Sequence, residues 1–443
     1  MKTLLFLMLM AGASLIITSC MADSLATSPQ EETLPHPAPE LQPAAPLIAP
    51  SNRSSQAQAA AQGANDFAFR LAAALARDIG DDNLVVSPYS VWLPLAALVN
   101  ATMEPYQSQL LEALGGAGLS ASDINQAASR MLFHLTDEGN RRSAQVHGFH
   151  HHDSLHIANA VFIDNSFTIR PDFAQTYMDF FRGEILNAPF PAKEAIDLIN
   201  NWAYFHTQGL IPSIVSSLDP DAIAVIINAI FFSDKWMNPF PESMTHQDIF
   251  HGPVGEGNAY FMELAEQHIG YFEDEHIQAV NLHFLHGGAL TILLPRSGSA
   301  TELLASMTGD YFAYIQEGIA MTLGRLVLPR FTIEHSMDNL AEVLAEMGIP
   351  LFDGGAAPLT GGLVEEPIPV WISNVIQKAM IDVDEEGTTA AAVTAMEMVG
   401  SALPPEPEDV FEMICNRPFV FVLHRYTLDG GNQVLFAGVV NRP

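Results

Sequence analysis

The sequence is short of cysteine and of positive charge. Only two of its 443 residues are cysteines, Cys20 and Cys415, which excludes a disulfide-stabilised scaffold. Lys and Arg number 18 against 51 Asp and Glu, for a formal net charge of -33. Phosphate groups would repel so acidic a chain, which disfavours nucleic-acid binding and charge-driven docking to anionic membranes. No apolar run approaches the roughly 20 residues of a membrane-spanning helix.

The chain nevertheless carries enough apolar material for a sizeable core. Hydrophobic residues make up 49% of it and charged residues 16%, a balance that disfavours intrinsic disorder over most of the length. Predicted helices dominate the first half and predicted strands the second, with no strict β–α–β alternation and no internal repeat. This order predicts one α+β domain rather than several.

The first residues are typical of an export signal. A positive start is followed by an almost wholly apolar run from residue 4 to residue 17, too short for a transmembrane helix. The run ends in Ile-Thr-Ser-Cys at Cys20, which resembles the bacterial lipobox, whose cysteine is lipidated. We therefore expect residues 1–19 to be a signal peptide and Cys20 a lipid anchor. The alternative is an ordinary signal peptide with a chance cysteine.

Residues 20–62 are predicted to form a disordered tether. They are mostly Pro, Ala, Ser and Gln, with little to bury. A flexible chain of about 42 residues typically reaches about 35–40 Å. The tether would hold the folded part, residues 63–443, near a membrane of a bacterial cell envelope, with exposure on the cell surface as one option.

Hydrophobic periodicity predicts the main elements of the folded part. A helix is expected from Asn65, and a second from Ser87-Pro88, which Pro94 should kink or shorten. Further helices are predicted at 171–182 and 195–205, and strands at 156–163, 223–232, 289–294, 321–328, 375–383, 418–426 and 434–439.

The segment 384–407 has an unusual pattern. From Gly387 to Gly400 it contains one charge, Glu397, and no proline. Small or apolar side chains occupy alternate positions, so one face of a strand here suits burial in a sheet. These positions are Thr388, Ala390, Ala392, Thr394, Met396 and Met398. Prolines at 404, 405 and 407 then prevent pairing in a central strand.

Over about residues 65 to 443 the sequence resembles the serpin family. The hinge of inhibitory serpins resembles the run Glu385, Glu386, Gly387, Thr388, Thr389, Ala390, Ala391 and Ala392. Further matches follow in the family's order at 83–90, 157–160, 199–202, 228–232, 235–236, 328–331 and 417–421. The resemblance implies an α+β serpin fold, with helices packed on large β-sheets and an exposed reactive-centre loop at about 385–407.

The resemblance implies suicide-substrate inhibition of serine endopeptidases by a monomer without a cofactor. A protease attacks the loop and forms an acyl-enzyme, and the cut loop then inserts into the large sheet and distorts the covalently bound protease. The segment after Gly387 is neither charged nor rich in proline, which favours the inhibitory type. A non-inhibitory serpin-fold binding protein is one alternative.

An exported hydrolase is the other alternative. The sequence has no G-x-S-x-G and no H-E-x-x-H motif. A catalytic triad assembled from distant residues stays open, because such triads are recognised by geometry. That alternative leaves the strand-like loop unexplained.

The usual serpin loop length places the scissile bond at Ser401–Ala402. The small residues around it suit the shallow pockets of elastase-like or subtilisin-like enzymes, and papain-like cysteine proteases are a further class. No Lys or Arg occurs in the loop, which disfavours trypsin-like targets. Glu397 and Met398 leave a shifted cleavage position open.

Three residues resemble the serpin shutter, where the sheet opens: Ser90, Asn228 and Gln377. Many serpins have a histidine where Gln377 stands. Glutamine donates and accepts hydrogen bonds, so the network is expected to survive without pH sensitivity, with ordinary satisfaction of core polar groups as the alternative. Arg330 and Glu385 resemble the pair at the top of the sheet and, as an exposed ion pair, should contribute little.

Five histidines lie close together, at 147, 150, 151, 152 and 156. Their spacing is irregular and no cysteine is nearby, so a solvated loop is favoured over a metal site. Cys415 is predicted to be a buried structural thiol.

Overall fold

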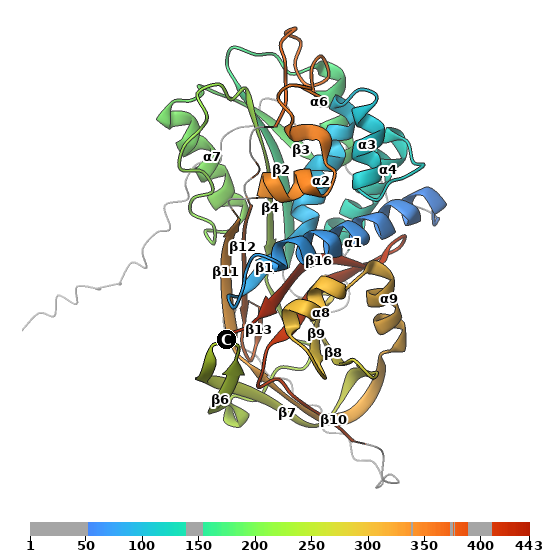
Figure 1. The fold of residues 1–443 in the computed structure, drawn as a ribbon, viewed down its shortest axis with the longest axis vertical. Helices are drawn as coiled ribbons and strands as arrows, with labels where there is room; N and C mark the ends of the chain where they lie inside the picture. Colours follow the sequence, from blue (N-terminus) through green and yellow to red (C-terminus); the bar gives the residue numbers. More distant parts are fainter. Residues whose placement is uncertain (1–51, 139–153, 338–339, 373–374, 376, 389–409) are drawn as a thin grey trace, which may run out of the picture. The chain divides into compact units, whose positions relative to one another are not determined.

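The computed structural model describes residues 52–138, 154–337, 340–372, 375, 377–388 and 410–443. Figure 1 shows their helices and strands. The helices are α1 (Ser55–Ala76), α2 (Pro88–Leu98), α3 (Tyr106–Ala113), α4 (Ala121–Leu132), α6 (Pro171–Phe181), α7 (Lys193–His206), α8 (Ala300–Ser306), α9 (Gly309–Gly318) and α10 (Leu340–Glu346), with short helical turns η1 (Val99–Ala101), η2 (Phe133–Glu138), η3 (Glu242–Met244) and η4 (Pro350–Phe352).

The largest sheet has nine strands, in the order β1-β16-β15-β9-β8-β7-β10-β14 with β6 paired to β7. Its strands are β1 (Leu84–Val86), β6 (His246–Gly252), β7 (Gly255–Glu273), β8 (Ile277–His283), β9 (Ala289–Pro295), β10 (Ala320–Pro329), β14 (Phe411–Ile414), β15 (Phe419–Thr427) and β16 (Gly431–Val440). Helices α1 and α8 pack against β16.

There are two smaller sheets among the described residues, and one of them contains the start of the predicted hinge. One has the order β11-β12-β13-β5, with β11 (Phe331–Met337), β12 (Gln377–Val383), β13 (Gly387–Thr388) and β5 (Asp234–Lys235). The other has the order β3-β2-β4, with β3 (Gly183–Ala188), β2 (Leu155–Asp164) and β4 (Ala224–Phe232). Only Ser233 separates β4 from β5 in the chain, so the two sheets are joined at that point.

Helix α7 covers one face of the three-stranded sheet, with which it forms a separate apolar cluster. Trp202 and Ile199 of the helix pack there with Phe162 of β2 and Ile227 of β4. The predicted strand at 223–232 is confirmed as β4, and its residues under α7 are buried. Residues on the other face of β4, such as Asn228, are only half-buried.

Helix α1 begins at Ser55 rather than at the predicted Asn65, so residues 55–62 of the predicted tether are helical. Ser54 caps the helix by accepting a hydrogen bond from the Ala57 amide at 3.3 Å. The alanines at 57, 60 and 61 are buried. Small side chains that looked unable to form a core are instead the right size for a closely packed helix.

Helix α2 begins at Pro88 after Ser87, as predicted, but it is not shortened at Pro94. An interior proline removes one backbone hydrogen bond and costs about 3 kcal/mol or more. Trp92 and Leu93 beside it are fully buried, and burying a large apolar side chain contributes about 1.5–3 kcal/mol. Tertiary packing therefore offsets the local preference, and the helix continues to Leu98.

Candidate functional site

Two residues of the predicted hinge already lie in a sheet. Gly387 and Thr388 form β13 between β12 and β5, with Thr388 opposite Val383 on one side and opposite Asp234 on the other. Thr388 is only 2% exposed. The start of the predicted loop therefore occupies a central strand position in the intact chain.

Gly387 is required here by close approach. A Cβ atom on it would lie 2.1 Å from the carbonyl oxygen of Asp234 and 2.8 Å from the Cα of Lys235. No side chain fits into that space. Glycine at this position of the predicted hinge therefore lets β13 reach β5.

The residues before Gly387 are held by main-chain hydrogen bonds. The amide of Phe240 donates to the Glu385 carbonyl at 2.9 Å, and the amide of Trp236 donates to the Glu386 carbonyl at 2.8 Å. The Trp236 indole donates to the Asp384 carbonyl at 2.9 Å and stacks on Phe284 with ring centres 4.5 Å apart. Trp236 therefore lies directly against the hinge.

The Arg330–Glu385 pair is not the exposed ion pair that the sequence suggested. The Glu385 side chain is 6% exposed, against 46% for Arg330. Glu385 accepts hydrogen bonds from Arg330 Nε at 2.9 Å and Nη2 at 2.6 Å, and from Thr245. Burial raises the pKa of Glu385, but these hydrogen bonds outweigh burial and hold the pKa below its usual value. The pair therefore fixes the residues at the start of the predicted hinge.

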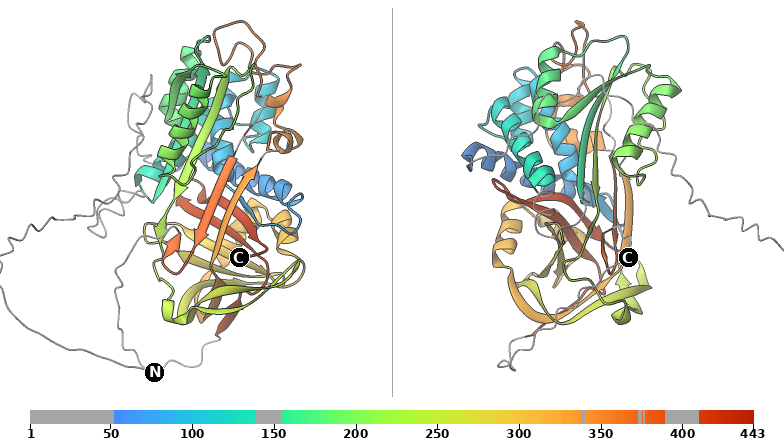
Figure 2. Two further views of the ribbon diagram at one scale, coloured as in Figure 1. Left: turned by 90° about the vertical axis from the view of Figure 1, so that its left-hand side faces the viewer. Right: turned by 180° about the vertical axis from the view of Figure 1, so that it is seen from behind.

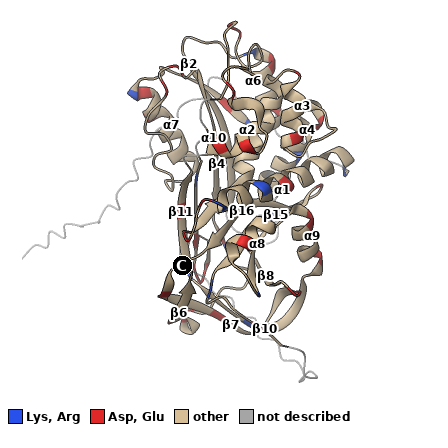
Figure 3. Ribbon diagram, viewed as in Figure 1, with Lys and Arg blue, Asp and Glu red and all other residues tan. Residues whose placement is uncertain are grey.

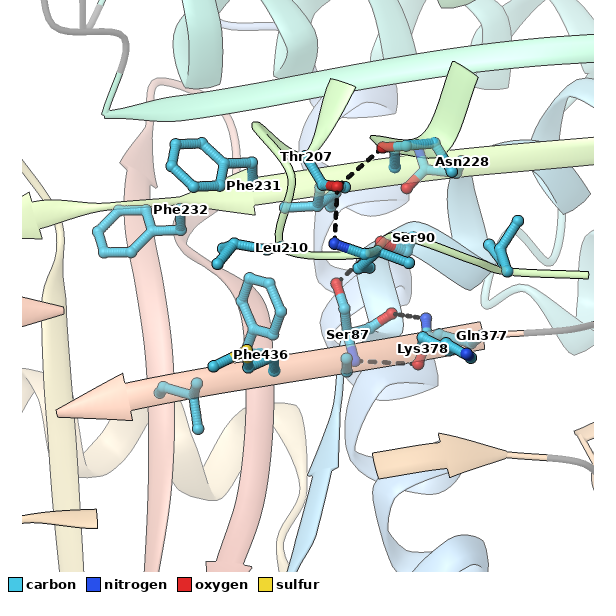
Figure 4. Close-up of a pocket in the computed structure, with 18 of the residues that line it drawn as sticks. Ser87, Ser90, Thr207, Leu210, Asn228, Phe231, Phe232, Gln377, Lys378 and Phe436 are labelled. Atoms are coloured by element: carbon cyan, nitrogen blue, oxygen red, sulfur yellow. Dashed lines mark hydrogen bonds between the residues drawn. The ribbon is translucent and has the colours of Figure 1, made fainter. Parts of the chain in front are cut away.

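Beyond β13 a groove separates β12 from β4, which do not pair with each other. Figure 2 shows the orange strands β11 and β12 beside the green strand β4. Residues from β4, from β12 and from α7 line the groove (Figure 4). Thr388 of β13 also lines it. A second cavity of about 700 Å³ shares Ser90, Asn228 and Gln377 with it and extends along β4 toward Trp371. Within the part of the chain that the structure describes, two sheet edges thus face each other across an open space.

Two of the three predicted shutter residues share one hydrogen-bond network. Gln377 Nε2 donates to the Ser87 carbonyl at 2.7 Å, and the Ser87 amide donates to Gln377 Oε1 at 3.1 Å (Figure 4). Ser90 Oγ donates to Ser87 Oγ at 3.0 Å. Ser87, which was not among the predicted shutter residues, links the other two. Its place before Pro88, at the start of a helix, was the available signal.

Asn228 lines the same groove but belongs to a different network. Its Nδ2 donates to Asn159 Oδ1 at 2.7 Å, across the β2–β4 pair. Its Oδ1 is buried and has no hydrogen-bond partner within the part of the chain that the structure describes. Asn228 therefore offers a free acceptor beside the groove.

Several predicted residues lie outside the described residues: Cys20, the tether up to residue 51, Thr389, Ala390, Ala391, Ala392, Ser401, Ala402 and the histidines 147–152. Of the histidine cluster, only His156 is described, and it lies 2.9 Å from His206 between ring nitrogens. Within the described ranges, no group of three or more metal-ligating side chains is found. None of the helices there is long and apolar enough to cross a membrane.

Cys415 is buried and unpaired, as expected. Burial raises the pKa of its thiol to about 12, so it stays protonated at neutral pH.

Comparisons with known proteins agree with this architecture. A family model described as Serpin (serine protease inhibitor) matches residues 62–443. An alpha-1-antitrypsin-like protein of Tamias sibiricus is 28% identical over 386 residues, covering 85% of this chain and 87% of that protein. Serpin-Z7 of Hordeum vulgare is 27% identical over 395 residues, covering 85% and 94%.

Solved structures show the same likeness. The thermophilic serpin tengpin in its native state has a TM-score of 0.74 and 25% identity, covering 89% of this chain and 96% of that one. Human thyroxine-binding globulin, at 22% identity, has a TM-score of 0.73 and shares the fold, covering 88% of this chain and 100% of that one.

This arrangement of sheets, with a groove between β12 and β4 and with Gly387 and Thr388 paired in β13, defines a serpin fold of the α+β class, as predicted. The chain belongs to the serpin family. Members of this family are mostly protease inhibitors rather than enzymes, although non-inhibitory members exist.

Proposed function

We propose that this serpin is a suicide-substrate inhibitor of serine endopeptidases. The observation that carries the proposal is the pairing of Gly387 and Thr388 between β12 and β5. It places the start of the loop at the end of a groove whose two walls, β4 and β12, are strand edges that do not pair with each other among the described residues. Unpaired backbone groups at a sheet edge are a template for an added strand.

Insertion into this groove would release enough free energy to distort a bound protease. About a dozen residues gaining ladder hydrogen bonds at about 1 kcal/mol each amount to about 10 kcal/mol. That is comparable to the stability of a typical domain, about 5–15 kcal/mol. Small alternate side chains such as Ala390 and Ala392 would enter without obstruction.

The register of β13 indicates which loop residue would reach the shutter. Thr388 lies opposite Val383 in an antiparallel pair, so each further step along the loop moves one step back along β12. Residue 394 would then stand opposite Gln377. Thr394 would bring a hydroxyl close to the free Oδ1 of Asn228, which supports insertion along the whole groove.

The proposed targets are elastase-like or subtilisin-like enzymes, with papain-like cysteine proteases as a further class. Small residues around Ser401–Ala402 support a shallow specificity pocket. A trypsin-like pocket would leave its buried acidic group unpaired, and such a polar mismatch lowers the kcat/KM of a substrate by several orders of magnitude.

Charge supports a protein rather than a nucleic acid as partner. Lys and Arg are sparse over the described chain (Figure 3). Many of those present are neutralised within the fold, as in the pairs Arg130–Asp429 and Arg325–Glu263. The acidic surplus is thus left without internal compensation.

We further propose that the protein is an exported monomer held by lipid on Cys20 to a bacterial cell-envelope membrane, with surface exposure as one option. The sequence from residue 1 to Cys20 supports this. The protease would be met outside the cytoplasm.

The test is incubation of the protein with a panel of proteases, followed by SDS gels and mass spectrometry. An inhibitor gives an SDS-stable complex and releases a C-terminal fragment that begins at Ala402. The same protease with its catalytic serine replaced by alanine is the control and should give no complex. Cleavage without any complex would identify a non-inhibitory serpin, and turnover of peptide substrates by the protein alone would identify a hydrolase.

A further inference from the structure

A buried carboxylate stands at the point where β5 receives the hinge. The Asp234 side chain is 0% exposed. Its Oδ1 accepts hydrogen bonds from His286 Nδ1 at 2.7 Å and from the Lys235 amide at 2.8 Å, and its Oδ2 accepts from the His286 amide at 3.0 Å. Buried charges persist only where such hydrogen bonds satisfy them. His286 therefore contributes both a side-chain and a main-chain donor to one carboxylate.

The main chain of the same residue contacts the hinge. Asp234 is paired with Thr388, and its amide donates to Thr388 Oγ1 at 3.3 Å. Its carbonyl oxygen is the atom that a Cβ on Gly387 would strike. Shifts of tenths of an ångström in the Asp234 backbone would thus disturb its contacts with Gly387 and Thr388.

A buried cation also contacts His286. Arg425 is 3% exposed and donates to the His286 carbonyl at 2.5 Å and to the Leu135 carbonyl at 3.0 Å. Burial lowers the pKa of Arg425, and the charge of Asp234 opposes that shift. The turn that carries His286 is therefore held both by Arg425 of β15 and by Asp234 of β5.

We propose that His286 is a positioning residue for loop insertion, acting through Asp234. By fixing the Asp234 carboxylate, it holds the β5 backbone where Gly387 and Thr388 can pair before any cleavage. The loop then begins insertion from a seated hinge, which shortens the time in which the acyl-enzyme can hydrolyse. The insertion part of this inference rests on the proposed inhibitory function, whereas the seating of the hinge does not.

The experiment compares His286→Ala with His286→Asn in the full-length protein. An asparagine amide can reach the place of imidazole Nδ1 and donate to Asp234, whereas alanine cannot. His276→Ala is the matched control. The His276 side chain is 69% exposed, and its ring nitrogen lies near Glu275, which is outside this cluster. Two quantities are measured: the moles of inhibitor consumed per mole of protease, and the emission of Trp236 in the uncut protein. The emission of Trp236 is obtained by subtracting the spectrum of the same protein with Trp236→Phe from the spectrum of each protein.

We expect His286→Ala to shift Trp236 emission to longer wavelength, because the indole loses its contact with a seated hinge. The moles of this variant consumed per mole of protease should rise about tenfold, which is the size expected when a hydrogen bond to a charged group is lost. His286→Asn and His276→Ala should behave as the parent does. If His286→Ala does not fold, Asp234→Asn replaces it, because its amide N–H would face one of the His286 donors.

Unchanged emission in His286→Ala would overturn the proposal, as would a His286→Asn variant that fails to restore the parental values. Shifted emission with an unchanged consumption ratio would overturn the link to insertion. Measuring the emission needs no protease, so the seating of the hinge is tested separately from the inhibitory function. If the parent traps no protease but His286→Ala still shifts the Trp236 emission, the inhibitory function is refuted and the seating of the hinge is retained.

Discussion

Thr388 lies directly opposite Val383 in an antiparallel pair, so the first alternate side chain of the loop is buried before any protease arrives. A residue expected to enter the sheet only after cleavage is already part of it. Substitutions at Thr388 therefore act on the intact protein as well as on the inserted one.

Replacing Thr388 with Arg should convert the inhibitor into a substrate. An unpaired buried guanidinium is costly, so the hinge should leave the sheet and insertion should stall while the acyl-enzyme hydrolyses. Thermal unfolding of the uncut variant should also fall, because the site is buried from the start. Thr388→Val, which keeps the volume, is the control and should still form SDS-stable complexes. Parental stoichiometry of inhibition in Thr388→Arg would contradict the insertion mechanism.

Gly387→Ala should expel the hinge through a steric clash alone. Its Cβ would meet the Asp234 carbonyl oxygen at 2.1 Å, and the lost β13 pairing corresponds to about 1 kcal/mol per hydrogen bond. The consumption of inhibitor per protease should rise. Gly257→Ala is the matched control, because a Cβ there meets nothing within 4 Å. If both variants consume the same amount of inhibitor per protease, β5 can move away from the added Cβ at no cost in free energy.

Stability should fall with acid because of His424. Burial lowers the pKa of this histidine to about 3, while the unfolded chain titrates near about 6.5. The unfolded state therefore binds a proton that the folded state excludes, and the stabilisation present above about pH 6.5 is lost as the pH falls. At pH 5 the loss is about 2 kcal/mol. Urea unfolding at pH 7.5 and 5 should show a smaller difference for His424→Gln than for the parent.

Changing Cys20 to Ala should release the protein from the membrane fraction. The apolar run before Cys20 is too short to anchor the chain by itself, so attachment should depend on lipid at this residue. Cell fractionation followed by immunoblotting measures the outcome. A Cys20→Ala variant that stays in the membrane fraction as the parent does would locate the anchor elsewhere.

Replacing Ser401 with Arg should add inhibition of trypsin. The change supplies the cation that a trypsin-like pocket requires and leaves the residues from Gly387 to Gly400 intact. Rates of complex formation with trypsin and with an elastase, for parent and variant, measure the exchange of specificity. A released fragment that starts several residues from Ala402 would move the scissile bond, and efficient trapping of trypsin by the parent would contradict the proposed specificity.

The sequence by itself determined the fold class and the family, and it predicted the place of the hinge. Hydrophobic periodicity located most helices and strands closely, because α6, α7 and β2 follow their local apolar patterns. The run from Glu385 to Ala392 carried the family resemblance in neighbouring residues. Such features depend on side chains that are close in the chain, so they can be recognised without knowledge of the packing.

Only the tertiary structure decided how these parts are used. It extended α1 to Ser55, carried α2 past Pro94 and buried Glu385, because packing against other elements outweighed local preference. Its central contacts join residues remote in sequence: Ser87 and Gln377 are 290 residues apart, and Asp234 and His286 are 52 apart. Sheet pairing brings such residues together, and no local pattern records which edge a strand will meet. For that reason the seating of Gly387 and Thr388 against Asp234 is a property of the folded chain.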